Sequence, residues 1–492
     1  MIAHFPILQV IIPLMAAPIC LILKRPKLVW LFALIVSGLA FSISILLLQQ
    51  VMTSGVISYE LGGWQAPWGI EYRIDKLNAF VLLIITAIST IVLFAAQTSI
   101  EKEIPKNKHT YFYVLFLLSL TGMLGIVATG DAFNVFVFLE ISSLSAYALI
   151  AIGKDKRALW ASYQYLIMGT IGATFILIGI GLMYQMTGTL NMQDLSQRLP
   201  EVAQTRTVFT AFAFVIVGIC LKLALFPLHL WLPNAYAYAP SIVTAFFAAT
   251  ATKVAIYLLI RFTFSVFGLS FSFTTIPLQT LFMALGLLGI FIASTSAIYQ
   301  NNIKHLFAYS SIAQIGYMIV GFSLTTVAGL TATLLHLFNH ALMKSGIFLA
   351  LAAVMYRIGN VQLNSFYGLG KQMPLTMAAI VIGGLSLIGV PLTVGFISKW
   401  YLLVALLEQG WWPVAVLILL GSLIAVIYIW RIVEVAYFKE PLLNNKPVKE
   451  APLYFLIPIW TLIIANIYFG IDTRLSVQVA EAAAMSLFEV TP

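Results

Sequence analysis

Five ionisable side chains lie inside long apolar stretches of this 492-residue sequence: Glu140, Lys222, Lys253, Lys344 and Lys399. A charge in the middle of a membrane costs from about 2.5 kcal/mol on insertion scales to well over ~10 kcal/mol in simulations, so such residues usually face the interior of a helix bundle and mark an ion or proton path. Burial favours the neutral amine of a lysine, and a nearby carboxylate favours the charged form. A lysine whose carboxylate partner can move away is therefore a switchable proton site. Glu140 is the natural partner, because it is the only acidic residue in mid-stretch.

Two histidines add to this set in the segment LLHLFNHALMKSG, where His336, His340 and Lys344 are spaced i, i+4, i+8. This spacing places all three on one face of a helix. A neutral imidazole accepts a proton on one nitrogen and donates one from the other near physiological pH, which suits a proton relay. A metal site is disfavoured, because no acidic residue lies nearby in this helix and zinc needs further ligands.

The two cysteines, Cys20 and Cys220, form neither a Cys-x-x-C motif nor a zinc-binding spacing. They offer no ligand set for an iron–sulfur cluster, so we expect no metal and no cofactor in this chain. The structural alternative for the buried charges is that they reach the membrane surface or form fixed ion pairs. One mid-stretch carboxylate for four lysines leaves three lysines without such a partner, which counts against a purely structural scaffold.

The composition places these residues in a membrane protein. Hydrophobic residues make up 61% of the chain and charged residues only 9%, against about a quarter charged in soluble domains. With a mean hydropathy of +1.01, the chain is neither disordered, nor a disulfide scaffold, nor an ordinary cytosolic enzyme. About 20 apolar residues cross the roughly 30 Å of hydrocarbon as a helix, and we expect an all-α, polytopic membrane protein with about fourteen such helices. The predicted spans are 5–23, 28–52, 76–97, 110–129, 131–152, 160–186, 206–224, 240–263, 275–297, 305–322, 326–355, 374–405, 412–437 and 452–471.

The orientation follows from lysine and arginine, which accumulate in cytoplasmic loops. Sixteen of them lie in the odd-numbered loops, and six lie in the even-numbered loops and the C-terminal tail. We therefore expect both termini on the outer side of a plasma membrane. The net charge of +9 reflects this topology, and no soluble basic module is present that would bind nucleic acid.

Two spans carry helix breakers beside their lysines. In CLKLALFPLHLWLP, Lys222 is followed by Pro227, and in GVPLTVGFISKW, Pro391 and Gly395 precede Lys399. Proline and glycine free backbone groups that must line a cavity or find other partners in a membrane helix. Simple packing kinks are the alternative interpretation.

Broken helices at corresponding places of two halves are typical of inverted-repeat transporters. We therefore expect two inverted five-helix repeats with broken helices, at residues 110–267 (helices 4–8) and 268–438 (helices 9–13). Residues 1–109 would hold the first three helices, and residues 439–492 the last helix and a short tail.

Five segments carry a specific resemblance to a known family. They are LKLALFPLHLWLPNAYAYAP, ATKVAIYLLIRF, NIKHLFAYSSIAQIGYM, HLFNHALMKSGIFLAL and GVPLTVGFISKWYL. Together they resemble the antiporter-like membrane subunits of respiratory complex I, and more closely the D subunit of Mrp-type multisubunit Na⁺/H⁺ antiporters. The resemblance covers roughly residues 110–435, with the segments in the family's order.

The resemblance implies roles for the buried charges. Glu140 of the fifth span would pair with Lys222 of the broken seventh span, and Lys253 would be the central relay lysine of the eighth. The relay would continue through the two histidines of the eleventh span and end at Lys399. One complex I subunit of this set has glutamate at that last position, so a lysine there favours the Mrp subunit or the other complex I subunits.

Two functions remain open on this evidence. The first is a proton-translocating subunit that works with other membrane subunits, through which Na⁺ would pass in exchange. The second is the proton-pumping module of an NADH:quinone oxidoreductase or a membrane-bound hydrogenase, which would be part of an enzyme without holding its redox centres.

Overall fold

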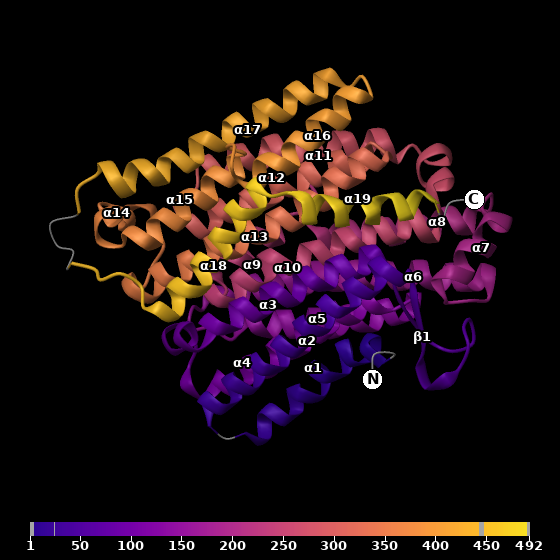
Figure 1. Cartoon of the computed structure of the whole chain (residues 1–492), viewed down its shortest axis with the longest axis horizontal. Coiled ribbons are helices and arrows are strands. Elements are labelled where there is room, and N and C mark those ends of the chain that lie inside the picture. The colour runs from indigo at the N-terminus through magenta and orange to yellow at the C-terminus, as the bar shows by residue number, and fades with distance from the viewer. Residues whose placement is uncertain (1–3, 24, 442–446, 490–492) are drawn as a thin grey trace.

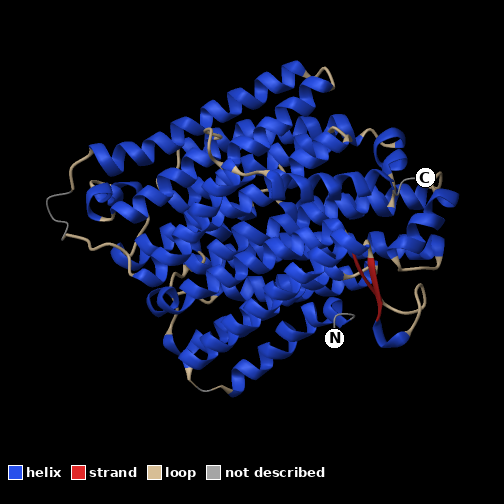
Figure 2. Ribbon diagram, viewed as in Figure 1, coloured by secondary structure: helices blue, strands red, loops and turns tan. Residues whose placement is uncertain are grey.

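The computed structural model describes residues 4–23, 25–441 and 447–489. Lys24 and Lys446, which entered the count of basic loop residues, lie outside the described residues, as do the terminal residues 1–3 and 490–492. The described chain is a bundle of helices that run side by side, with one small sheet at its edge (Figures 1 and 2). The all-α membrane fold predicted from the hydropathy is confirmed.

In chain order, the helices are α1 (Phe5–Ile22), α2 (Pro26–Ser54), α3 (Lys76–Glu103), α4 (His109–Ala128), α5 (Ala132–Ala151), α6 (Arg157–Thr187), α7 (Met192–Val202), α8 (Arg206–Leu223), α9 (Trp231–Tyr238), α10 (Ser241–Ile260), α11 (Leu278–Ile298), α12 (Ile303–Ser323), α13 (Val327–Ile358), α14 (Leu369–Gln372), α15 (Pro374–Ile388), α16 (Val394–Glu408), α17 (Trp412–Val433), α18 (Leu453–Ile471) and α19 (Arg474–Glu489). Strands β1 (Ile57–Glu60) and β2 (Glu71–Ile74) pair antiparallel. Short π-helical turns extend the chain at Arg261–Val266, Ser270–Thr275 and Glu434–Phe438.

Within the described residues, thirteen helices are long and apolar enough to cross a membrane. The remaining predicted span, 374–405, is divided into α15 and α16, which have 15 residues each. The seventh span is also broken, because α8 ends at Leu223 and α9 begins at Trp231. The predicted total of about fourteen crossings therefore consists of these thirteen helices and one divided pair.

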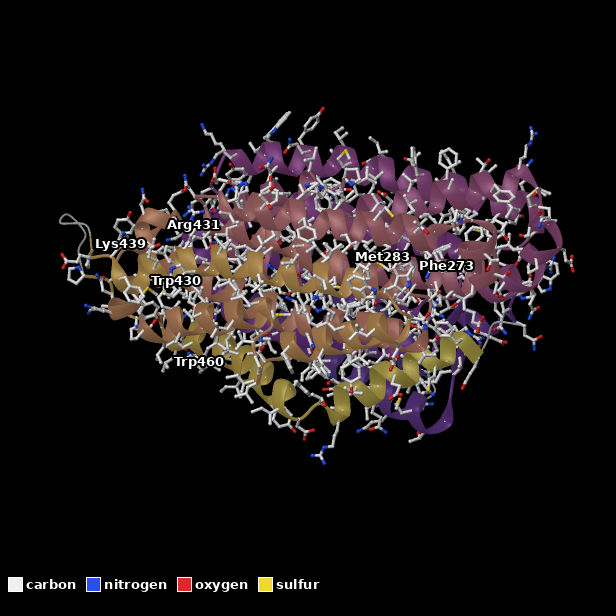
Figure 3. The ribbon with its side chains drawn as sticks, turned by 90° about the horizontal axis from the view of Figure 1, so that it is seen from above. Phe273, Met283, Trp430, Arg431, Lys439 and Trp460 are labelled. Atoms are coloured by element: carbon white, nitrogen blue, oxygen red, sulfur yellow. The ribbon has the colours of Figure 1, made fainter. Side chains whose placement is uncertain are left out.

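The two ends of the bundle differ in charge. One end carries the β1–β2 hairpin, the start of α1, where His4 bonds to Tyr59, and the end of α19, where Phe488 packs on Phe264. We call this the hairpin end. The opposite end carries most of the basic loop residues, among them Arg431 and Lys439, which Figure 3 places far from Phe273. We call this the basic end.

Two consecutive sets of helices each contain a broken helix at the fourth place. The first set is α4, α5, α6, α8 with α9, and α10; the second is α11, α12, α13, α15 with α16, and α17. Within each set the first two helices pack on each other. The division of the chain into repeats at residues 109, 267 and 438 stays a prediction.

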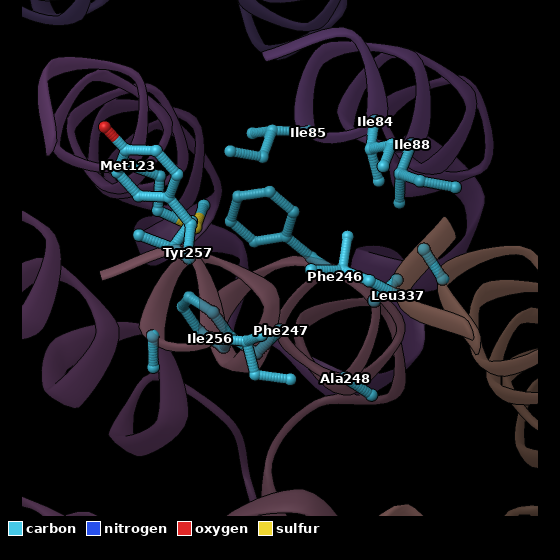
Figure 4. Close-up of a cluster of buried hydrophobic side chains, with 14 of the residues drawn as sticks. Ile84, Ile85, Ile88, Met123, Phe246, Phe247, Ala248, Ile256, Tyr257 and Leu337 are labelled. Carbon is cyan, nitrogen blue, oxygen red and sulfur yellow. The ribbon is translucent and has the colours of Figure 1, made fainter. Parts of the chain in front are cut away.

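Helix α10 runs through the centre of the molecule, and all but one of the side chains of Ser241–Ile260 are buried. Figure 4 shows Phe246 and Phe247 of this helix among side chains from α3, α4 and α13. The Phe246 ring stacks on Phe116 of α4 at 4.1 Å between centroids. Lipid is as apolar as leucine, so close packing rather than escape from water holds such helices together.

Helix α3 is fastened to the rest of the bundle at both of its ends. Asp75 caps its first turn and forms an ion pair with Arg261, at 2.7 Å, beyond the end of α10. Glu103, its last residue, accepts hydrogen bonds from the backbone N–H and hydroxyl of Ser241, the first residue of α10, both at 3.0 Å. Lys304 at the start of α12 lies 3.9 Å from the same carboxylate. Carboxylates at the two ends of α3 therefore hold α10 along its length.

Candidate functional site

Lys399 lies at the break between α15 and α16. Its ammonium nitrogen donates to the carbonyl oxygens of Leu387 and Ile388, both at 2.9 Å, and to the hydroxyl of Ser422, also at 2.9 Å. The carbonyls at the end of a helix have no helical donor and carry partial negative charge. The break therefore creates a binding site for the lysine cation, which also lies 4.5 Å from the centroid of the Tyr317 ring.

The sequence explains why α15 ends where it does. Gly389 has φ +95° and Leu392 has φ +69°, so the chain turns through the left-handed region twice. Gly395 then lets α16 pack directly against α15, because a Cβ at this position would lie 1.7 Å from the carbonyl oxygen of Ser386. The backbone N–H of Gly395 donates to the Ser386 hydroxyl at 3.1 Å.

His336 on α13 lies next to this site. Its Nδ1 is 2.8 Å from the hydroxyl of Ser398, and its Nε2 is 2.9 Å from the side-chain carbonyl oxygen of Gln314. A carbonyl oxygen only accepts, so Nε2 donates and Nδ1 accepts from the serine hydroxyl. Ser398 directly precedes Lys399, so the imidazole and the ammonium group belong to one polar cluster.

Three further titratable side chains lie in the centre of the bundle and are wholly buried: Lys253, His340 and Lys344. The rings of His336 and His340 are parallel, with 6.2 Å between their centroids. Neither ring nitrogen of His340 has a hydrogen-bond partner among the described residues. Both nitrogens of this wholly buried imidazole are therefore unpaired within the described part of the chain.

The two central lysines have backbone partners. Lys344 donates to the carbonyl oxygen of Phe307 at 2.7 Å and to the hydroxyl of Ser310. Lys253 donates to the carbonyl oxygen of Ala248 at 2.5 Å. Lys253 also interacts electrostatically with Lys344 and with both histidines of α13. A proton on one of these groups therefore changes the energy of a proton on the others.

Lys222 lies in the last turn of α8, at the other break. Its ammonium nitrogen donates to the hydroxyl of Ser143 on α5 at 2.8 Å, and it interacts electrostatically with Glu140 on the same helix. In the described part of the chain the two side chains form no salt bridge within 4 Å. Their predicted pairing stays a prediction, with Ser143 as the direct partner of the lysine in this structure.

The structure thus gathers the seven candidate residues into two groups. Lys253, Lys399 and the α13 side chains form one group, and Glu140 and Lys222 form the other. Helix α8 packs on α10, so the two groups lie on neighbouring helices. In the described residues, no three His, Cys, Asp or Glu side chains are placed to hold a metal ion.

Comparison with known proteins adds the family. The family model described as "NADH:quinone oxidoreductase/Mrp antiporter, TM" matches residues 129–425, which include every candidate residue. The chain belongs to this family. The resemblance inferred from the five sequence segments is therefore confirmed.

Relatives in this family have two kinds of name. The chain is 39% identical over 489 residues to the NADH-quinone oxidoreductase subunit N of Desulforudis audaxviator, with 96% of each chain covered. It is 30% identical over 485 residues to the D subunit of the Na(+)/H(+) antiporter of Bacillus subtilis, with 98% of this chain and 97% of the relative covered.

Solved structures share the fold over the whole chain. A chain of the membrane-bound sulfane sulfur reductase, an archaeal respiratory membrane complex, matches with a TM-score of 0.91 at 32% identity, covering 99% of both chains. A chain of the Mrp complex from Dietzia sp. also has a TM-score of 0.91, at 23% identity, covering 100% of this chain and 98% of that one. The second match supports the fold alone.

Several contacts at the site come from residues that the sequence did not single out. They are Ser143, Gln314, Tyr317, Ser398 and Ser422, which all contact Lys222, His336 or Lys399. A single hydroxyl or amide side chain changes the mean hydropathy of a span little, so these residues do not stand out in an apolar stretch of sequence. The one available signal is the adjacency of Ser398 to Lys399.

Proposed function

We propose that this chain is the proton-translocating subunit of a multisubunit Na⁺/H⁺ antiporter. Protons move along a row of side chains through the middle of the membrane: Glu140, Lys222, Lys253, His336, His340, Lys344 and Lys399. The observation that carries the proposal is the cluster at the second break, where Lys399, Ser398, His336 and Gln314 follow one another at 2.8–2.9 Å or in adjacent sequence positions.

The chemistry of the row favours protons. Its members are six nitrogen bases and one carboxylate, whereas hard metal cations prefer oxygen ligands. Interacting groups titrate as a unit, so protonation at one site alters its neighbours and can pass a charge along the row. Sodium would therefore cross through other subunits of the assembly, which are the expected partners of this chain.

The orientation follows from the charge of the two ends. The basic end faces the cytoplasm, and the hairpin end faces the outside of a plasma membrane. Both termini then lie outside, since α1 begins and α19 ends at the hairpin end. The two five-helix sets would be inverted repeats, so that α9 opens towards the cytoplasm and α16 towards the outside.

A second function is favoured by a specific observation. The 39% identity to a subunit N and the 32% identity to a chain of the sulfane sulfur reductase complex support a pumping module of a redox-driven complex. The same row would then move protons in response to electron transfer in other subunits. Co-purification distinguishes the two assemblies, because only a redox complex would bring iron–sulfur or quinone-binding subunits with the chain.

The test of proton transfer uses Glu140→Ala and Lys222→Ala in the intact assembly, reconstituted in vesicles. Each substitution should abolish Na⁺-driven proton movement, recorded with a pH-sensitive dye. Lys106→Ala, in the exposed turn Lys106–Lys108 that follows α3 at the basic end, is the matched control and should keep activity. If both row variants assemble normally and keep full activity, the row is structural and the proposal is wrong.

A further inference from the structure

A second buried cluster lies at the hairpin end, outside the row. Arg261 directly follows α10, where the helix changes to a π-helical turn, and only 8% of this arginine is exposed. Its guanidinium donates to the Asp75 carboxylate at 2.7 Å, to the side-chain carbonyl oxygen of Asn78 at 2.8 Å and to the Ser265 hydroxyl at 3.2 Å. π-Helical turns inside helices are frequent at functional sites.

The cluster is aligned with the central lysine of the row. Lys253, Tyr257 and Arg261 are spaced i, i+4, i+8, so they follow one another along the helix, and Arg261 lies about 12 Å from Lys253 towards the hairpin end. Tyr257 is wholly enclosed between them, beside Met123 (Figure 4). Its hydroxyl accepts from the Asn78 amide at 2.9 Å and donates to the carbonyl oxygen of Val127 at 3.2 Å.

This arrangement cannot pass a proton. A guanidinium has donors only and does not release its proton in proteins, so it ends any hydrogen-bonded relay. The Tyr257 hydroxyl donates its single proton to a backbone carbonyl oxygen, which has no proton to pass on. A fixed positive charge in a narrow, buried position also repels incoming protons and cations, as pore arginines do in selective channels.

The opposite end of α10 is built differently. Beside Pro240, a cavity of about 280 Å³ is lined by charged side chains that include Glu103 and Arg157. The buried cation on that side is Lys304, next to Glu103, and a lysine can release its proton in a protein whereas an arginine cannot. The two ends of α10, the helix that carries Lys253, therefore differ in how readily protons can enter or leave.

We propose that Arg261, held by Asp75 and Asn78, is a barrier between Lys253 and the hairpin end of the molecule. This barrier prevents protons and cations from passing between the two. This inference rests on the proposed function of the row. Protons on Lys253 then leave only along the row or towards the basic end, and a gradient across the membrane does not discharge through α10.

The experiment measures passive proton conductance of the intact assembly in vesicles. A pH step is imposed in sodium-free buffer with valinomycin and potassium, and its decay is followed with an internal pH dye. Arg261→Gln should raise the conductance about tenfold, equivalent to a barrier lower by about 1.36 kcal/mol. Arg261→Lys keeps the positive charge but can release its proton, so it should raise the conductance by less than Arg261→Gln does. Arg206→Gln, which removes an exposed arginine at the same end, should stay near the parent value.

Unchanged conductance in assembled Arg261→Gln overturns the proposal, and so does an equal rise in Arg261→Lys, which would mean that packing rather than charge forms the barrier. If Arg261→Gln does not assemble, Asn78→Asp places a second carboxylate beside Asp75 against the guanidinium, so that the cluster carries a net negative charge. The same rise is then expected, and no rise overturns the proposal. Because sodium is absent, this readout is independent of exchange, and failure of the row's function is seen only in the Glu140 and Lys222 variants.

Discussion

The Lys399 ammonium group lies 2.9 Å from the carbonyl oxygen of Leu387, a residue twelve positions earlier in the chain. In an uninterrupted helix that carbonyl would accept from the N–H of residue 391, which is a proline and has none. The lysine side chain thus takes the place of the missing helical donor. A titratable side-chain cation occupies a position that a backbone amide fills elsewhere.

Pro391→Ala should weaken this site by restoring a backbone N–H that competes for the Leu387 carbonyl. We expect the rate of proton transport to fall about tenfold, corresponding to about 1.4 kcal/mol, with the assembly intact. Initial rates in vesicles measure the effect. A rate equal to the parent's would show that Lys399 does not depend on the free carbonyl.

Ser398→Ala removes the hydroxyl that bonds His336 Nδ1 and leaves a buried ring nitrogen without a partner. The lost hydrogen bond should cost about 1–3 kcal/mol and slow proton transport, whereas Ser398→Thr should restore much of the rate. Ser42→Ala, which removes an exposed hydroxyl on α2, is the matched control. Equal rates in Ser398→Ala and Ser42→Ala would contradict a relay role for the hydroxyl.

Gly395→Ala should destabilise the protein, because the added Cβ would lie 1.7 Å from the Ser386 carbonyl oxygen and force α15 and α16 apart. Overpacking of this kind costs about 1–3 kcal/mol or more. Gly38→Ala meets no atom within 4 Å and should leave stability unchanged or slightly raised. Thermal unfolding in detergent compares the two variants, and equal midpoints would disprove the close packing.

Asp155 lies in the loop between α5 and α6, where hydrogen bonds from Arg157 hold the pKa of its carboxyl below the usual value. Its stabilising contribution is therefore complete above the ordinary aspartate pKa of about 3.9, and it is lost as the pH falls through the lower pKa of the folded state. The pair is exposed, so Asp155→Asn should lower stability by less than about 1 kcal/mol at pH 7. At a pH well below the lowered pKa of the folded state, the variant and parent should unfold at the same temperature; a difference that persists there would contradict this origin.

The sequence was sufficient for features that repeat along the chain. Apolar runs predicted the spans, and Pro227 and Pro391 predicted both breaks, because these signals are local. The i, i+4, i+8 spacing also placed His336 and His340 correctly on one face, as their parallel rings show. Each of these features depends on residues within one helix.

Contacts between distant segments could not be predicted in this way. Arg261 and Lys304 counted as loop residues in the topology, yet both side chains are buried and bonded, to Asp75 and to the carbonyl oxygen of Ala239. A basic residue at the end of a span looks the same in sequence whether it reaches solvent or a carboxylate on another helix. Only the fold brings such partners together.

The contacts that Asp75 and Glu103 make at the two ends of α3 also constrain the order in which the helices can pack during synthesis. Asp75 is joined to a residue that is synthesised 186 positions later, and Glu103 to one that is 138 positions later. As helices enter the membrane in sequence, both carboxylates of α3 wait without their final partners until α10 has been inserted. A chaperone or insertase that shields α3 during this interval would act on the N-terminal helices first, and a nascent chain stalled before residue 261 would expose an unfinished surface that quality control could recognise.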